Sequence, residues 1–151
     1  MHRLIRLTSD DYRGYRKAYS RIEYSFFKKG EEDPWMSKQI REMTQGAIKG
    51  KGDFLNEVED PERELYFFEV DGETQGIVEL IFSQNVCTIY QFAVFEHGKG
   101  LGTILYKEVL KIIQDHQIRK ITLWCPYDGA QIFWRKQGFK PKSNFVFEKR
   151  A

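Results

Sequence analysis

Several kinds of residue are scarce in this chain of 151 residues, and each scarcity narrows the class of protein. It has only two cysteines, Cys87 and Cys125, and both lie in apolar runs typical of strands. We therefore expect two buried thiols in a reducing compartment rather than a disulfide framework. No apolar run approaches the roughly 18 residues of a membrane span, and the first residues do not resemble a signal peptide. These features predict a cytoplasmic protein with no membrane partner.

An excess of charge of one sign is also missing, because 24 Lys and Arg nearly balance 22 Asp and Glu. The charge is nevertheless uneven, since residues 53–73 hold nine acidic residues and a single basic one, Arg63, while residues 74–151 are basic. The basic half suits a polyanionic ligand and the acidic segment a cationic one, although ordinary solvated surface is the simpler interpretation of both. No basic cluster has the length or the interleaved aromatic residues of a nucleic-acid site, so we expect no nucleic-acid partner.

Aromatic residues are plentiful, at 15% of a chain whose length suits one domain over residues 1–151. Apolar patterning predicts strands over residues 4–7, 65–70, 75–82, 86–95, 121–125 and 144–148. It predicts helices over residues 12–26, 34–49, 101–116 and 128–137, and a polar loop over residues 50–64. The order of these elements indicates one mixed sheet with helices on both faces, and a β-α-β unit around residues 86–125.

The most informative stretch joins a predicted strand to a strongly predicted helix and contains Gly98, Gly100 and Gly102. Glycines let a backbone approach a ligand closely, and the N–H groups and dipole of a helix start favour phosphate. Lys99 adds a positive charge between the first two glycines. The spacing fits neither a Walker A loop nor the Gly-x-Gly-x-x-Gly dinucleotide motif, which disfavours a nucleotide-binding or flavin-binding regulatory domain. A flexible turn without a ligand is the remaining alternative.

The run His97-Gly-Lys-Gly-Leu-Gly102 resembles the motif Gln/Arg-x-x-Gly-x-Gly/Ala of the GNAT superfamily of acetyl-CoA-dependent N-acetyltransferases. A later motif of that family is similar to Asp128, Ala130, Trp134 and Gly138-Phe139. The resemblance implies a mixed α/β fold: a single GNAT-like domain with a central mixed, mostly antiparallel sheet of six to seven strands and about four helices on both faces. It also implies acetyl transfer from acetyl-CoA, as co-substrate, to a small-molecule or peptide amine by direct attack in a ternary complex.

The resemblance assigns cofactor binding to three segments. They comprise Phe92, Ala93 and Val94 on the strand, His97, Gly98, Lys99, Gly100, Gly102 and Thr103 at the loop and helix start, and Asp128, Ala130 and Trp134 downstream. The chain departs from the family pattern in three ways. His97 replaces Gln or Arg, and the short approach to His97 places the strand bulge that pairs with pantetheine only within residues 92–95. Trp134 stands where the family often has a tyrosine that protonates the departing thiolate, and an indole N–H is no proton source.

Catalysis needs a base, an oxyanion donor and an acid, and four side chains are candidates for a part in the first or the last. Glu79 lies in an apolar strand, where burial would raise its pKa toward that of a general base, although alternation equally allows the solvent face. Gln91, with Tyr90, is placed to position a water. Tyr127 is the best substitute acid, with Tyr90 in reserve, and an exposed loop tyrosine is the alternative interpretation of Tyr127. Cys125 is discounted as a nucleophile because no histidine lies near it in the sequence.

Two matters stay open in the sequence. The loss of the usual proton donor at Trp134 allows a catalytically silent module that binds and senses CoA or acyl-CoA. The acceptor is equally undetermined, and the acidic residues 53–73 suit a polyamine, an aminoglycoside or a basic peptide terminus. The three histidines show no metal-ligand spacing, so we expect no metal. Homodimers are common in the GNAT superfamily, and a homodimer is the assembly that the resemblance allows.

Overall fold

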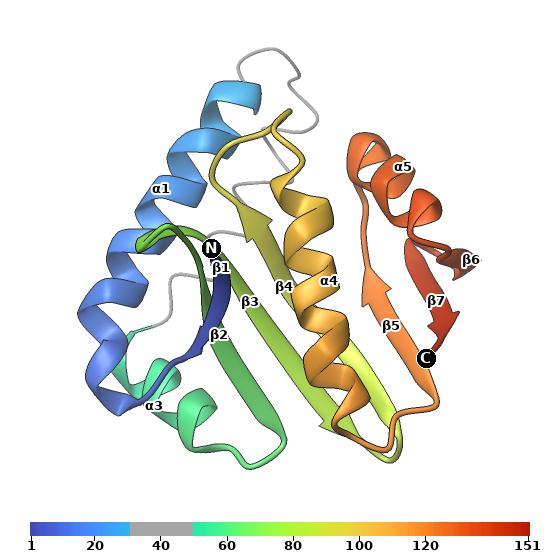
Figure 1. Ribbon diagram of the computed structural model, residues 1–151, viewed down its shortest axis with the longest axis horizontal. Helices are drawn as coiled ribbons and strands as arrows, with labels where there is room; N and C mark the ends of the chain where they lie inside the picture. The colour runs from blue at the N-terminus through green and yellow to red at the C-terminus, as the bar shows by residue number, and fades with distance from the viewer. Residues whose placement is uncertain (31–49) are drawn as a thin grey trace.

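Figure 1 shows the computed structural model as one twisted seven-stranded sheet with helices packed on both of its faces. The structure describes the backbone of residues 1–30 and 50–151 and the side chains of residues 1–21 and 50–151. The strands are β1 (His2–Arg6), β2 (Arg63–Val70), β3 (Glu73–Ser83), β4 (Val86–Val94), β5 (Lys120–Trp124), β6 (Lys140–Ser143) and β7 (Val146–Arg150). The helices are α1 (Tyr12–Gly30), α3 (Lys51–Glu59), α4 (Leu101–Gln114) and α5 (Asp128–Lys136), with a short 3-10 turn, η1 (Ser9–Asp11). The helix predicted over residues 34–49 lies outside the described residues.

The strand order is β1-β2-β3-β4-β5-β7-β6. Among the described strands, β4 and β5 form the one parallel pair, and α4 is the crossover that connects them. All other neighbouring strands are antiparallel. The mixed, mostly antiparallel sheet and its β-α-β unit are therefore confirmed.

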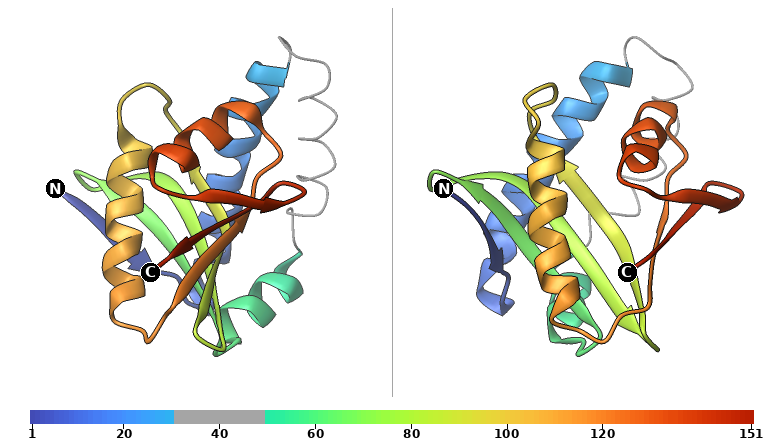
Figure 2. Two further views of the ribbon diagram at one scale, coloured as in Figure 1. Left: turned by 90° about the vertical axis from the view of Figure 1, so that its right-hand side faces the viewer. Right: turned by 45° about the vertical axis from the view of Figure 1, so that its right-hand side comes forward.

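Alternation along the strands builds two cores, one on each face of the sheet. Val78 and Leu80 of β3 point into the α4-side core, where α4 and α5 cover the sheet. Ile77, which precedes Val78 and points the opposite way, lies in the α1-side core with Tyr15 and Phe54, under α1 and α3. Figure 2 shows α4 on one side of β3 and β4, with α1 and α3 on the other. No helix among the described residues is long and apolar enough to cross a membrane.

Two segments differ from the sequence prediction. Residues 50–64 were predicted as a loop, which is wrong, because α3 occupies Lys51–Glu59. Its fully buried Phe54 has its ring centroid 4.9 Å from that of Tyr15 and 5.5 Å from that of Tyr12, and Leu55 and Val58 pack against the same core. The sequence also missed β6, an exposed Lys-Pro-Lys-Ser edge strand without a single large apolar residue.

Candidate active site

A β-bulge interrupts β4 in the middle of the sheet. Gln91 is paired with Glu79 and Ile89 with Leu80, which makes Tyr90 the extra residue of the bulge. The extra residue shifts the alternation of β4 by one, which is why Ile89 and Phe92 both face the α4-side core. The sequence analysis expected the bulge within residues 92–95. That expectation is wrong, because the bulge lies at Tyr90, just before this segment.

Beyond the bulge, β4 has an open edge. Its parallel pairing with β5 ends at Ile89 and Leu123, and Figure 1 shows the two strands diverging from there. On the other edge, the N–H of Phe95 donates to the carbonyl of Gln75 at 2.8 Å. Because successive residues of a strand turn their N–H and C=O groups to opposite neighbours, those of Phe92 and Val94 face the diverging side. A strand edge of this kind pairs with an extended ligand that carries amide groups.

The open edge leads directly into the glycine loop, residues 95–100, and then into α4. Gly98 and Gly100 have φ angles of 79° and 73°, in the left-handed region that favours glycine. Gly100 is the N-cap of α4 and no side chain caps the helix, so its first N–H groups have no acceptor within the helix. Lys99 Nζ lies 2.6 Å from Glu96 Oε2. Its positive charge is thus matched locally, and the anion-binding capacity of this end rests mainly on backbone N–H groups.

Tyr127 lies at the junction of β5 and α5, where it is the N-cap of α5. Its carbonyl accepts a 2.8 Å hydrogen bond from the N–H of Gln131 and closes the first turn of α5. Burial, with a smaller contribution from Cys125, raises the pKa of Tyr127 to about 12. The phenol therefore stays protonated at neutral pH and keeps a proton to donate.

Glu79 is fully buried, on the α1 side of the sheet rather than in solvent. Its Oε2 lies 3.1 Å from Nη1 of Arg63, and the same nitrogen lies 3.3 Å from Glu57 Oε1. Arg63 Nε lies 3.5 Å from Asp60 Oδ2, while its guanidinium carbon sits 5.4 Å from the centroid of the Tyr90 ring. One arginine thus connects α3, β2 and β3 to the bulge residue of β4. Sequence reasoning missed it, although Arg63 stood out as the only base among nine acids.

Comparison with known proteins assigns the chain to a family. The model of the acetyltransferase (GNAT) family matches residues 6–139. The chain belongs to the GNAT acetyltransferase family.

Solved structures show the same fold for this GNAT domain. PaiA N-acetyltransferase from Thermoplasma acidophilum, in complex with coenzyme A, is 20% identical with a TM-score of 0.73, covering 100% of this chain and 99% of that one. A probable acetyltransferase from Staphylococcus epidermidis is 10% identical with a TM-score of 0.75 and the same coverage. A GNAT acetyltransferase from Elizabethkingia anophelis with acetyl-CoA bound is 17% identical with a TM-score of 0.56, covering 68% of this chain and 84% of that one. No curated protein matches the chain.

The residues that resemble the later GNAT motif differ in their burial and in their place in α5. Trp134 is buried at 5% exposure, and its ring packs 4.8 Å from Phe92 and 5.6 Å from Tyr106, so it joins α5 to β4 and α4 within the core. Tyr127 is the N-cap of α5, and Asp128 is the first residue of the helix. Ala130 packs at the border of the α4-side core.

Gly102 has a packing role. A Cβ atom at this position would lie 3.4 Å from Cε2 of Phe133, so the glycine allows α4 to approach α5 closely. Thr103, one residue further into α4, is exposed, as is His97 in the loop. Within the described ranges, no group of three His, Cys, Asp or Glu side chains is arranged to hold a metal ion.

Proposed function

We propose that this GNAT acetyltransferase is an N-acetyltransferase, which moves the acetyl group of acetyl-CoA to a primary amine of a small molecule or peptide. The observation that carries the proposal is the continuous path from the bulge at Tyr90, along the open edge of β4, to the uncapped start of α4. Coenzyme A bound to the PaiA relative, and acetyl-CoA bound to the Elizabethkingia relative, support the choice of ligand.

In this proposal the cofactor binds along that path. The backbone groups of Phe92 and Val94 pair with the amides of pantetheine, while Ala93, between them, turns its own groups toward β3. Residues 97–103 hold the pyrophosphate through their N–H groups. Asp128 and Ala130 supply the first turn of α5 on the other side of the opening, and Trp134 fixes the position of that helix from within the core.

The proposed reaction is direct attack of the neutral amine on the thioester carbonyl. The amine gives up a proton to Glu79 through a water that Gln91 positions, and the new N–C bond forms as the carbonyl oxygen becomes an oxyanion. The backbone N–H of Phe92 donates to that oxyanion. The C–S bond then breaks, and the leaving thiolate takes the proton of Tyr127. Tyr127 thereby fills the role that Trp134 cannot fill.

Two measurements on the wild-type protein separate this proposal from its alternative, the catalytically silent CoA-binding module. Calorimetry with acetyl-CoA measures binding, and release of the free CoA thiol in the presence of a panel of primary amines measures turnover. Micromolar binding with thiol release for at least one amine supports the N-acetyltransferase. Binding without release for any amine favours the sensing module, and absence of binding contradicts both.

The setting of the reaction belongs to the same proposal. We place it in the cytoplasm, in a single domain over residues 1–151, and the free thiols of buried Cys87 and Cys125 support a reducing compartment. We predict that the reaction needs no metal and that the protein has no nucleic-acid or membrane partner. The formation of a homodimer is also a prediction.

A further inference from the structure

One arginine of α1 reaches the place where the glycine loop begins. Nη1 of Arg21 donates a 3.3 Å hydrogen bond to the carbonyl of Thr74, in β3. The guanidinium carbon of the same side chain lies 4.4 Å from the centroid of the ring of Phe95, the first residue of the loop. Arg21 therefore contacts both β3 and the loop, and it connects them to α1.

Phe95 is held by the sheet and the core as well as by Arg21. Its side chain is 8% exposed and belongs to the α1-side core, while its N–H donates to the carbonyl of Gln75 at 2.8 Å. The pairing of β2 with β3 skips Gln75, which makes this residue the extra one of a second bulge. Core packing, a backbone hydrogen bond and the Arg21 guanidinium thus act together on the residue that starts the loop.

The rest of the loop depends on that starting point. Residues 96–100 are exposed, and Gly98 and Gly100 leave the backbone more freedom than other residues would. The far end of the loop continues into α4, whose buried residues pack in the α4-side core. The direction in which the loop points its N–H groups is therefore set at one end by α4 and at the other by Phe95.

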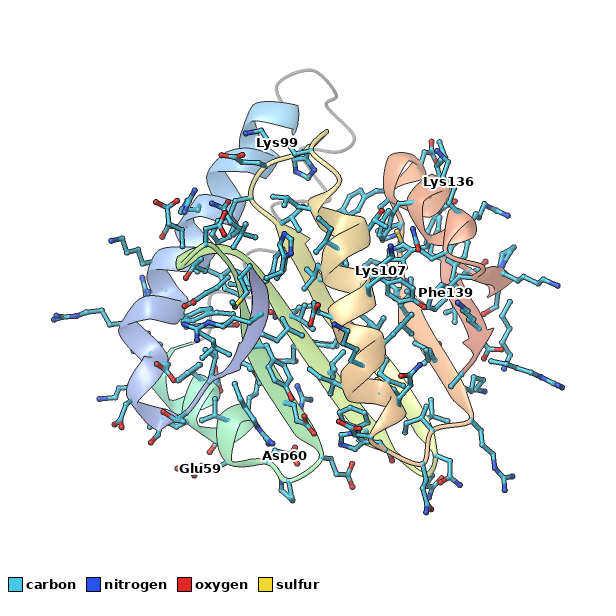
Figure 3. The ribbon with its side chains drawn as sticks, viewed as in Figure 1. Glu59, Asp60, Lys99, Lys107, Lys136 and Phe139 are labelled. Carbon is cyan, nitrogen blue, oxygen red and sulfur yellow. The ribbon has the colours of Figure 1, made fainter. Side chains whose placement is uncertain are left out.

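Arg21 also acts on the charge of the loop. Glu96 is the only acidic residue of the glycine loop, and its carboxylate would repel a phosphate. The pKa of Glu96 is lowered, first by its hydrogen bond and ion pair with Lys99 and to a smaller extent by the charge of Arg21. Figure 3 shows Lys99 at the end of the molecule opposite Glu59 and Asp60, so the acidic residues at the end of α3 lie away from this loop. Two cations thus counter the one carboxylate of the loop.

We propose that Arg21 is a positioning residue for acetyl-CoA, which holds the start of the glycine loop through Phe95 and Thr74 so that the loop N–H groups point at the pyrophosphate. Arg21 does not touch the cofactor in this proposal and acts through the loop. A loop that has its binding conformation only part of the time raises the apparent dissociation constant by the inverse of that fraction. The inference rests on the proposed function, because it concerns the loop to which the pyrophosphate is proposed to bind.

The test compares Arg21→Met with Arg13→Met by calorimetry with acetyl-CoA. Arg13 is the matched control, because it is exposed on the same helix, about 12 Å nearer to its start. Arg21→Met should bind acetyl-CoA about 3- to 30-fold more weakly, the range expected when a cation–π contact that holds the loop is lost. Arg13→Met should bind as wild type does. The weakening should persist at high salt, and a weakening that salt abolishes would overturn the positioning role, because screening removes an effect of charge alone.

Two further readouts separate the loop from the rest of the cofactor site. S-acetylpantetheine carries the thioester and the amides of acetyl-CoA but no pyrophosphate. With an amine that wild type acetylates, Arg21→Met should therefore leave kcat/KM for S-acetylpantetheine unchanged. Hydrogen exchange of the backbone amides of residues 96–100 should be faster in Arg21→Met than in Arg13→Met. Equal exchange rates in the two variants would contradict the hold on the loop.

The outcomes distinguish this inference from the proposed function. Equal affinity of Arg21→Met and Arg13→Met for acetyl-CoA, in a protein whose wild type binds it, would overturn the positioning role. An equal loss with acetyl-CoA and S-acetylpantetheine would also overturn it, because the effect would then arise outside the loop. Faster exchange in Arg21→Met, in a protein whose wild type does not bind acetyl-CoA, would support the hold on the loop and contradict the proposed function.

Discussion

Replacing Gly100 with glutamate places a carboxylate at the start of α4, where the pyrophosphate of acetyl-CoA is proposed to bind. Gly100 is the N-cap of the helix with φ 73° and ψ 9°, and a Cβ atom there would meet no other atom within 4 Å. The added side chain therefore fits the free protein. Its cost to folding is the left-handed conformation, about 1–2 kcal/mol for a residue with a Cβ.

The effect on binding follows from Coulomb's law. A unit negative charge about 5 Å from a phosphate is repelled by about 0.8 kcal/mol in bulk water and by about 3.3 kcal/mol at the effective dielectric constant of a protein surface. Those limits correspond to an affinity for acetyl-CoA that is about 4-fold to about 270-fold weaker. The backbone strain at Gly100 is present in the free and the bound protein alike, so it cancels from the difference in affinity.

Calorimetric titration with acetyl-CoA at two salt concentrations measures the change, because raising the salt should reduce it. Gly72→Glu is the matched control: Gly72 has φ 85°, a Cβ added there would meet no atom within 4 Å, and it lies in the β2–β3 turn, apart from the glycine loop in Figures 1 and 2. That variant carries the same charge and the same strain but should bind acetyl-CoA as wild type does. If Gly100→Glu and Gly72→Glu bind with equal affinity, the start of α4 does not hold the pyrophosphate, and the proposed cofactor path is wrong.

Three further perturbations test the rest of the structure. Gly76→Ala puts a Cβ 2.4 Å from the carbonyl oxygen of Ala93, so the free energy of unfolding in urea should fall by about 1–3 kcal/mol, and an unchanged midpoint would contradict the packing of β3 on β4. Tyr127→Phe should lower kcat about 100-fold or more with little change in KM, and a variant with wild-type kcat would remove Tyr127 from the mechanism. Wild type should lose no activity from ionisation of Tyr127 below the pKa of this residue, about 12. Burial raises the pKa of Cys87 from 9.0 to about 12, so above pH 9 the unfolded chain loses this proton while the folded chain keeps it, and stability falls with rising pH. Cys87→Ala should flatten that fall by up to about 1.4 kcal/mol per pH unit between pH 9 and pH 12, and parallel stability curves would refute the shift.

Much of the fold could be predicted because local pattern and tertiary structure agree along most of the chain. The Asp71-Gly72 pair, for example, predicts a tight hairpin, and both residues have positive φ angles, 50° and 85°. Prediction failed where the local signal is weak. α3 has few apolar residues around Phe54, and β6 is held by pairing with β7 rather than by any buried side chain of its own.

The candidate site could be predicted only in part from the sequence, for a different reason. The glycine loop is a contiguous stretch, so Gly98 and Gly100 were found from the sequence and do have the conformations that only glycine adopts readily. The side of the sheet to which Glu79 points could not be predicted, because an apolar strand that is covered on both sides shows no alternation of polar and apolar residues. Arg63, Glu57 and Glu79 meet through the pairing of β2 with β3 and the packing of α3, and no short motif records such a meeting. The roles of these residues in catalysis stay predictions.

The bulge at Tyr90 explains how both faces of the sheet take part in one site. Without the extra residue, Gln91 would follow Ile89 into the α4-side core, and Phe92 would turn to the α1 side. With it, Gln91 reaches the α1 side opposite Glu79, and Phe92 packs beneath Trp134. The same irregularity coincides with the end of pairing between β4 and β5, which exposes the backbone edge. A single inserted residue thus turns Gln91 to one face of β4 and places the proposed thioester path along the edge of the same strand, at adjacent positions of the chain. Any change that removes the bulge should therefore disturb both the position of Gln91 and cofactor binding, whereas Gly100→Glu should disturb cofactor binding alone.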